Sequence, residues 1–141
     1  MNLEQTIEVL KKAINEYMAL VKNQSQDINA LLDLRDRIAG YSFYFAEICG
    51  DLKIQYNYQH FIRKIMVAKD KQAFLKEGQT LGGSDNEALI KNEEAYNAQL
   101  ESEGDAYKAD LLLKQTNRVL DGIAQRISYL KIEKFETKNQ Q

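Results

Sequence analysis

Residues 28–77 decide the fold, and their sequence is INALLDLRDRIAGYSFYFAEICGDLKIQYNYQHFIRKIMVAKDKQAFLKE. This stretch contains no proline and only two glycines. Its apolar residues recur at spacings of three and four, which predicts one long helix with a coiled-coil-like seam. That seam consists of Leu31, Leu34, Ile38, Tyr41, Phe45, Ile48 and Leu52. A straight helix over this stretch would extend roughly 75 Å, far beyond a compact globule of this chain length. The helix therefore either bends at Gly40 or Gly50 or belongs to an elongated oligomer, and we favour the oligomer.

The segments on either side also show helical periodicity. Residues 1–22 carry apolar side chains every three or four positions, as Leu3, Ile7, Leu10, Ile14, Met18 and Val21, and Asn2 is a suitable N-cap. The polar residues 23–27 predict a turn, and residues 78–83, GQTLGG, predict a glycine loop. Ser84 and Glu87 have the spacing of a capping box that begins the next helix.

The C-terminal part, residues 84–134, is expected to form one or two helices, the last of them from about Asp105. Its apolar stripe contains Leu113, Leu120, Ile123, Ile127 and Leu130. The polar residues 135–141 predict a frayed tail. We therefore predict a single all-helical domain over residues 1–141. It would be all-α, an elongated hairpin or bundle of long helices with coiled-coil-like oligomerisation.

Composition agrees with this fold and excludes several classes of protein. The chain has 141 residues, 44% of them apolar, no proline, one cysteine and one histidine, with a net charge of −2. A single cysteine and histidine exclude a Cys/His zinc site and an intrachain disulfide, and we expect no cofactor. No apolar run reaches the length of a membrane span, and the first residues lack the pattern of a signal peptide. The expected location is the cytoplasm.

Charge is distributed unevenly along the chain. Residues 52–76 carry six bases and one acid, a net of +5, whereas residues 84–105 carry seven acids and one base, a net of −6. Aromatic residues lie among the bases, which is the combination that single-stranded nucleic acid requires, because cations neutralise phosphates and rings stack on bases. The candidate nucleic-acid-binding residues are Lys53, Tyr58, His60, Arg63, Lys64, Lys69 and Lys71.

A purely structural interpretation of this basic block stays open at this point. Phe61 and Phe74 have helical spacing and would fit a core. The bases would then pair with the acidic segment 84–105, folded back as an antiparallel helix.

The layout resembles the small phage recombination mediator proteins of the UvsY type. The shared features are an aromatic tract leading into a long basic helix, here 41–76, then the glycine loop 78–83, an acidic helix, and the apolar stripe 111–130 with a charged tail. Such mediators are all-helical and help to load a RecA-like recombinase onto single strands coated by single-strand-binding protein. The resemblance implies a ring-like homo-oligomer with Leu113, Leu120, Ile123, Ile127 and Leu130 as subunit contacts, and single-stranded DNA on the basic helix. It also implies the host cytoplasm, if the chain is phage-encoded.

These observations lead to one main hypothesis and one alternative. The main hypothesis is a non-enzymatic, single-stranded-DNA-binding accessory protein, with a recombinase and a single-strand-binding protein as possible partners. The alternative is a helical protein–protein interaction module, either a coiled-coil adaptor or a phage-type inhibitor of a host protein. Its active surface would be the acidic helix 84–105, with Glu101 and Glu103, imitating a phosphate backbone. An enzyme is not expected, because no placed base, nucleophile or metal set is visible.

Overall fold

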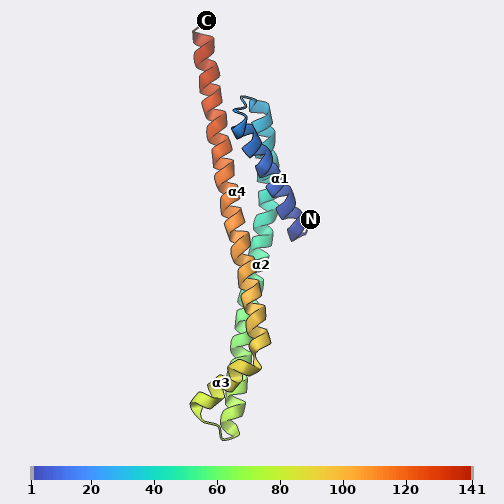
Figure 1. Cartoon of the computed structure of the whole chain (residues 1–141), viewed down its shortest axis with the longest axis vertical. Helices are drawn as coiled ribbons and strands as arrows, with labels where there is room; N and C mark the ends of the chain where they lie inside the picture. Colours follow the sequence, from blue (N-terminus) through green and yellow to red (C-terminus); the bar gives the residue numbers. More distant parts are fainter. Residues whose placement is uncertain (1, 141) are drawn as a thin grey trace. The chain divides into compact units, whose positions relative to one another are not determined.

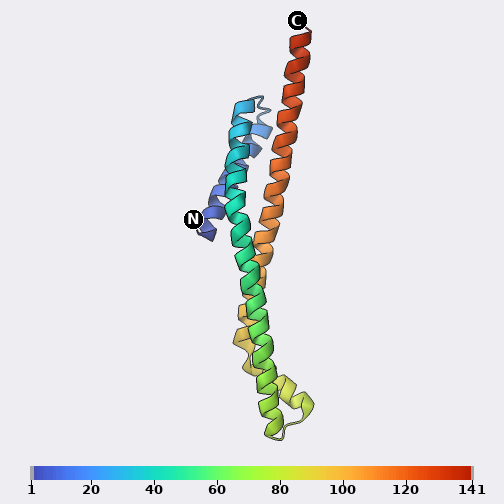
Figure 2. The same cartoon turned by 180° about the vertical axis from the view of Figure 1, so that it is seen from behind.

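The computed structural model describes residues 2–140, in which four α-helices and no strand occur (Figures 1 and 2). The helices are α1 (Leu3–Lys22), α2 (Ile28–Lys76), α3 (Leu81–Lys91) and α4 (Glu93–Asn139). The all-α class predicted from the sequence is confirmed. The expected single domain divides into two compact units: unit 1 holds residues 1–48 and 110–141, and unit 2 holds residues 49–109. Each unit contains three helical segments, because α2 and α4 contribute to both.

Local capping explains where α1 begins. The Asn2 side chain accepts a hydrogen bond from the Gln5 backbone N–H at 2.9 Å, and the Gln5 side chain accepts one from the Asn2 N–H at 3.1 Å. This reciprocal pair satisfies two amides that the helix leaves without partners. The predicted cap at Asn2 is confirmed, and α1 ends at Lys22, as its periodicity indicated.

The interior of unit 1 draws large apolar side chains from all three of its helical segments. The fully buried ones are Leu10 of α1, Leu31, Ile38 and Phe45 of α2, and Ile123 and Leu130 of α4. Burial of each such side chain contributes about 1.5–3 kcal/mol. The α2 residues belong to the seam predicted from the sequence. On α1 the buried line is Thr6, Leu10 and Ala13, whereas Met18 and Val21 of the predicted face are exposed.

The C-terminal stripe lies in this same interior. Ile123, Ile127 and Leu130 are 0%, 4% and 2% exposed within the single chain, and Leu113 and Leu120 are partly buried. The sequence-based interpretation gave all five residues to contacts between subunits. Their burial instead follows from α1 and α2 packing on α4 within unit 1. No second copy is needed to cover Ile123, Ile127 and Leu130, whereas subunit contacts of Leu113 and Leu120 stay a prediction.

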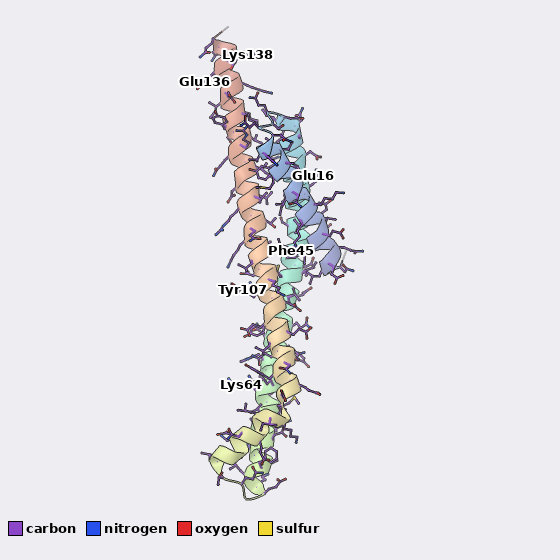
Figure 3. The ribbon with its side chains drawn as sticks, in the orientation of Figure 1. Glu16, Phe45, Lys64, Tyr107, Glu136 and Lys138 are labelled. Atoms are coloured by element: carbon purple, nitrogen blue, oxygen red, sulfur yellow. The ribbon has the colours of Figure 1, made fainter. Side chains whose placement is uncertain are left out.

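A polar contact joins α1 to α2 in unit 1, and a glycine lets α1 approach α4 closely. Arg37 of α2 donates to Asp33 Oδ2 at 2.9 Å and to Glu16 Oε2 of α1 at 2.6 Å. The hydrogen bond from Arg37 holds the pKa of Glu16 below its ordinary value. On the other side, a Cβ at Gly122 of α4 would lie 3.1 Å from the Tyr17 hydroxyl. The glycine therefore permits the close approach of α1 to α4. Figure 3 labels Glu16 of α1 and the buried Phe45 of α2, both of which belong to unit 1.

The connection from α2 to α3 begins earlier and is shorter than the predicted loop 78–83. Gly78 has φ 87°, a conformation that favours glycine, and α3 already begins at Leu81. The Thr80 hydroxyl accepts from the Gly83 N–H at 3.1 Å. The predicted Ser84–Glu87 capping box is wrong, because Thr80 caps the helix one turn earlier. Ser84 is buried inside α3 and donates to the Leu81 carbonyl.

Residues 84–134 form parts of two helices, and the break lies at Asn92 rather than near Asp105. Asn92 ends α3, and its carbonyl accepts the Tyr96 N–H in the first turn of α4. Helix α4 continues through Gly104 and reaches Asn139. A frayed tail is therefore wrong for residues 135–139, and Gln141 lies outside the described residues. Figures 1 and 2 show the last turns of α4 extending past the α1–α2 connection within unit 1.

Candidate nucleic-acid interface

The candidate binding residues lie on the part of α2 that belongs to unit 2, and they divide between two faces of the helix. Arg63 lies on the inner face, toward α4. Its guanidinium donates to Gln99 Oε1 at 3.1 Å and stacks 4.5 Å from the centre of the Tyr96 ring. Gln99 is buried. Arg63 thus stabilises the contact between α2 and α4, and its charge is partly engaged by this packing.

A polar cluster on the same inner face fixes the break between α3 and α4. Asp70 accepts hydrogen bonds from Asn92 Nδ2 at 2.7 Å and from Lys91 Nζ at 3.1 Å. Both hydrogen bonds lower the pKa of Asp70, and the bond from Asn92 has the larger effect. The Lys91 ammonium also lies 5.8 Å from the centre of the Phe74 ring. The cluster therefore joins the end of α2 to both following helices.

Lys71 is paired with the acidic segment, as the structural interpretation of the block required. Its ammonium lies 2.7 Å from Asp85 Oδ1 of α3. Lys64 and Lys69, by contrast, form no ion pair with another residue of the described range 2–140. The pairing hypothesis is therefore correct for Lys71 but does not account for the whole block.

The outer face of α2 in unit 2 carries the remaining candidates. Tyr58 and Phe61 are 61% and 60% exposed, so Phe61 is not a core residue, whereas Phe74 is half-buried. Lys53, His60, Lys64 and Lys69 are exposed as well. Within residues 2–140, Lys64 (labelled in Figure 3) and Lys69 form no ion pair. The structure thus brings two rings and unpaired cations together on one helix surface.

Exposed rings beside unpaired lysines are the two kinds of group that surfaces for single-stranded nucleic acid combine. Exposed rings can stack on bases for about 1–3 kcal/mol each, and lysine ammonium groups can neutralise phosphates on either side. His60 lies beside Tyr56, with 6.3 Å between the ring centres. We define the basic–aromatic face as Tyr58, Phe61, Lys64 and Lys69; His60 is exposed, but it lies two residues after Tyr58 in the helix, so its side chain does not lie beside the Tyr58 ring.

Sequence reasoning missed residues on both faces of α2. On the inner face, Asn92, Tyr96 and Gln99 carry the contacts, and no local pattern distinguishes them from other polar residues. On the outer face, Ile54, Tyr58, Phe61, Ile65 and Leu75 follow a second 3–4 spacing. That signal is present in the sequence, but it is out of phase with the seam that contains Leu31 and Phe45.

Comparison of the chain with protein-family models, with curated proteins and with solved structures finds no match. Within residues 2–140, no three His, Cys, Asp or Glu side chains gather so that they could hold a metal ion. Over the same residues, none of the helices is both long enough and apolar enough to cross a membrane.

Proposed function

We propose that this chain is a non-enzymatic accessory protein that binds single-stranded DNA on the basic–aromatic face of α2. The observation that carries the proposal is the exposure of the Tyr58 and Phe61 rings beside Lys64 and Lys69, which have no ion-pair partner in residues 2–140. An exposed ring on a helix surface can be covered by a nucleic-acid base that stacks on it, and an unpaired lysine beside the ring attracts a backbone phosphate.

Binding of this kind would be electrostatic and tolerant of sequence. Arg63 and Lys71 are engaged within unit 2, so the cations best placed for phosphates are Lys64, Lys69 and the exposed Lys76. About three phosphate contacts on a single strand give a slope of log K against log salt near −2. Affinity would then fall roughly 15-fold between about 50 and 200 mM salt.

The resemblance to UvsY-type mediators extends this proposal to partners. In that role the chain would act as a homo-oligomer in the host cytoplasm. It would help a RecA-like recombinase to displace single-strand-binding protein. The exposed lysines and rings support the DNA contact only, and the protein partners depend on the resemblance alone.

The test is fluorescence anisotropy of a labelled oligo-dT titrated with the protein at several salt concentrations. Lys64→Glu with Lys69→Glu should weaken binding and flatten the salt dependence, because two of the three available cations are lost. The matched control is Lys11→Glu with Lys131→Glu, which changes the net charge equally on exposed positions of unit 1. Equal affinity of the two double variants, or no binding by the unchanged protein at low salt, would refute the proposal.

A second candidate is the protein–protein interaction module, and one observation favours it. Glu101 and Glu103 on α4 are exposed and form no ion pair within residues 2–140. An adaptor or inhibitor that uses this acidic surface would bind no DNA at any salt concentration. It would lose its protein partner on Glu101→Gln with Glu103→Gln. The oligo-dT titration separates this candidate from the first.

A further inference from the structure

The outer face of α2 in unit 2 forms an apolar seam that nothing in the unit covers. Its members are Ile54, Tyr58, Phe61, Ile65, Ala68, Gln72 and Leu75, with alternating spacings of four and three. Ile54 is 68% exposed, Tyr58 61% and Phe61 60%; Ile65 and Leu75 are less so. A 3–4 repeat of apolar residues is the pattern by which one helix packs along another. We call these seven residues the α2 seam.

Lysines border the α2 seam on both sides. In the heptad frame of the seam, Lys64 and Lys71 occupy one flank, and Lys69 and Lys76 occupy the other. Lys71 is held by Asp85, whereas Lys64, Lys69 and Lys76 form no ion pair in the described part of the chain. Flanking charges of one sign select a helix whose flanks carry the opposite sign. The α2 seam therefore favours an acidic amphipathic helix.

This chain itself carries such a helix surface, on the outer face of α4 in unit 2. Asn97, Leu100, Gly104 and Tyr107 have spacings of three, four and three, the same as Tyr58, Phe61, Ile65 and Ala68. Leu100 and Tyr107 (the latter labelled in Figure 3) are exposed. The flanks of this α4 seam carry three glutamates, Glu94, Glu101 and Glu103, and one base, Lys108; all four are exposed, and the glutamates form no ion pair in residues 2–140.

Gly104 gives the α4 seam room for a close neighbour. A glycine inside a helix costs about 1 kcal/mol relative to alanine. A Cβ at Gly104 would meet no atom within 4 Å, so packing inside unit 2 does not require the glycine. Its position between Leu100 and Tyr107 leaves a shallow gap in the apolar row. A side chain from another helix can enter that gap.

We propose that the α2 seam of one copy packs on the α4 seam of the next copy. The two rows match in spacing, with Leu100 and Tyr107 as the apolar side chains of the α4 seam, and the flanking lysines of the α2 seam meet flanks that carry three glutamates against one lysine. Helix α4 is in front of α2 in unit 2 in Figure 1, and α2 is in front in Figure 2, which is seen from behind; each seam consists of residues exposed on its own helix. A copy thus offers two different surfaces, and the contact is head to tail, which generates a ring or a filament.

The assembly goes beyond the proposed DNA binding and does not depend on it. One consequence does rest on that proposed function: the α2 seam shares Tyr58, Phe61, Lys64 and Lys69 with the basic–aromatic face. A strand and a neighbouring copy would compete for this surface. Excess oligo-dT should then shorten the assembly.

The first experiment measures mass by sedimentation velocity for two variants that each disable one seam. Phe61→Glu places a charge in the α2 seam, and Leu100→Glu places one in the α4 seam. Both sites are exposed in unit 2, so circular dichroism should show unchanged helicity. Each variant alone should be a monomer. Mixed in equal amounts they should form a 1:1 dimer that grows no further, because each copy retains one working surface.

The second experiment tests the charge matching. Lys64→Glu with Lys69→Glu, and separately Glu101→Lys with Glu103→Lys, should each prevent assembly, whereas their mixture should restore it. The control Lys11→Glu with Lys131→Glu in unit 1 should assemble like the unchanged protein. A monomeric unchanged protein, or seam variants that keep their full mass, would overturn the proposal.

The same samples separate this proposal from the DNA proposal. Glu101→Lys with Glu103→Lys keeps the basic–aromatic face and should bind oligo-dT at least as tightly as the unchanged protein. The Leu100→Glu monomer leaves the basic–aromatic face uncovered, so failure of that variant to bind oligo-dT would remove the DNA proposal alone. DNA binding by a monomeric unchanged protein would remove the assembly alone.

Discussion

Replacement of Ile123 by alanine tests whether the C-terminal stripe stabilises the single chain or joins subunits. Ile123 is 0% exposed in unit 1. The change removes three side-chain carbons, at about 0.8 kcal/mol each, and leaves a cavity, so the free energy of unfolding should fall by about 3 kcal/mol within the usual range of about 2–5. That loss is a large part of the roughly 5–15 kcal/mol by which a domain is stable.

The assay is urea unfolding followed by circular dichroism, with the mass of the native protein measured beside it. A slope of about 1–3 kcal/mol per molar urea moves the midpoint downward by about 1–3 M. Ile132→Ala is the matched control, because Ile132 lies on the same helix but is 59% exposed. Its effect should stay within about 0.5 kcal/mol.

The opposite pattern would refute this reasoning. If Ile123→Ala lowered the mass of the protein while its monomer unfolded at the same urea concentration as the unchanged chain, Ile123 would lie between subunits. The interpretation of the stripe as a subunit contact would then be restored. Equal effects of Ile123→Ala and Ile132→Ala would likewise contradict the burial difference.

Three further predictions concern polar contacts. Arg37 holds the pKa of Glu16 below its usual 4.5, so the Glu16 carboxylate stabilises the fold at neutral pH, and this contribution is lost as the pH falls through the lowered pKa. Glu16→Gln should therefore reduce the free energy of unfolding at neutral pH. Unfolding curves measured at several pH values should also show a weaker loss of stability in acid for this variant. Asn92→Ala removes the 2.7 Å hydrogen bond to a carboxylate and should cost about 1.5–3 kcal/mol in urea unfolding, and no change would exclude a structural role for that bond. Thr80→Ala should lower the free energy of unfolding by about 1 kcal/mol. Ser84→Ala should lower it by less, because the Ser84 hydroxyl only donates to the Leu81 carbonyl inside the helix. The reverse order would restore Ser84 as the cap.

Local sequence signals located most of the helices but not all of their ends. The Asn2 cap and the start of α2 follow from short-range chemistry, and both predictions agree with the structure. Near α3, Thr80 and Ser84 are both good caps one turn apart. The chain uses Thr80, and Ser84 becomes a buried residue of the helix. Two equivalent local signals can be ranked only when burial is known.

The candidate site was predicted in part. The sequence located the basic and aromatic residues on one helix, and exposure is now found for Tyr58, His60, Lys64 and Lys69. It could not tell that Arg63 turns inward to Gln99 and Tyr96. Charge and residue type do not reveal which side of a helix its neighbours occupy.

The sequence by itself determined that the chain is all-α, because helical periodicity and the absence of proline are properties of neighbouring residues. It left a break at Gly40 or Gly50 open, and the structure shows that α2 continues through both glycines from Ile28 to Lys76. Only the tertiary structure decided which apolar row is covered in each place. The row with Ile123 is buried by the chain's own helices, whereas the row with Phe61 is exposed. Periodicity shows that a helix has an apolar face, but the contacts between segments distant in sequence determine what lies against that face.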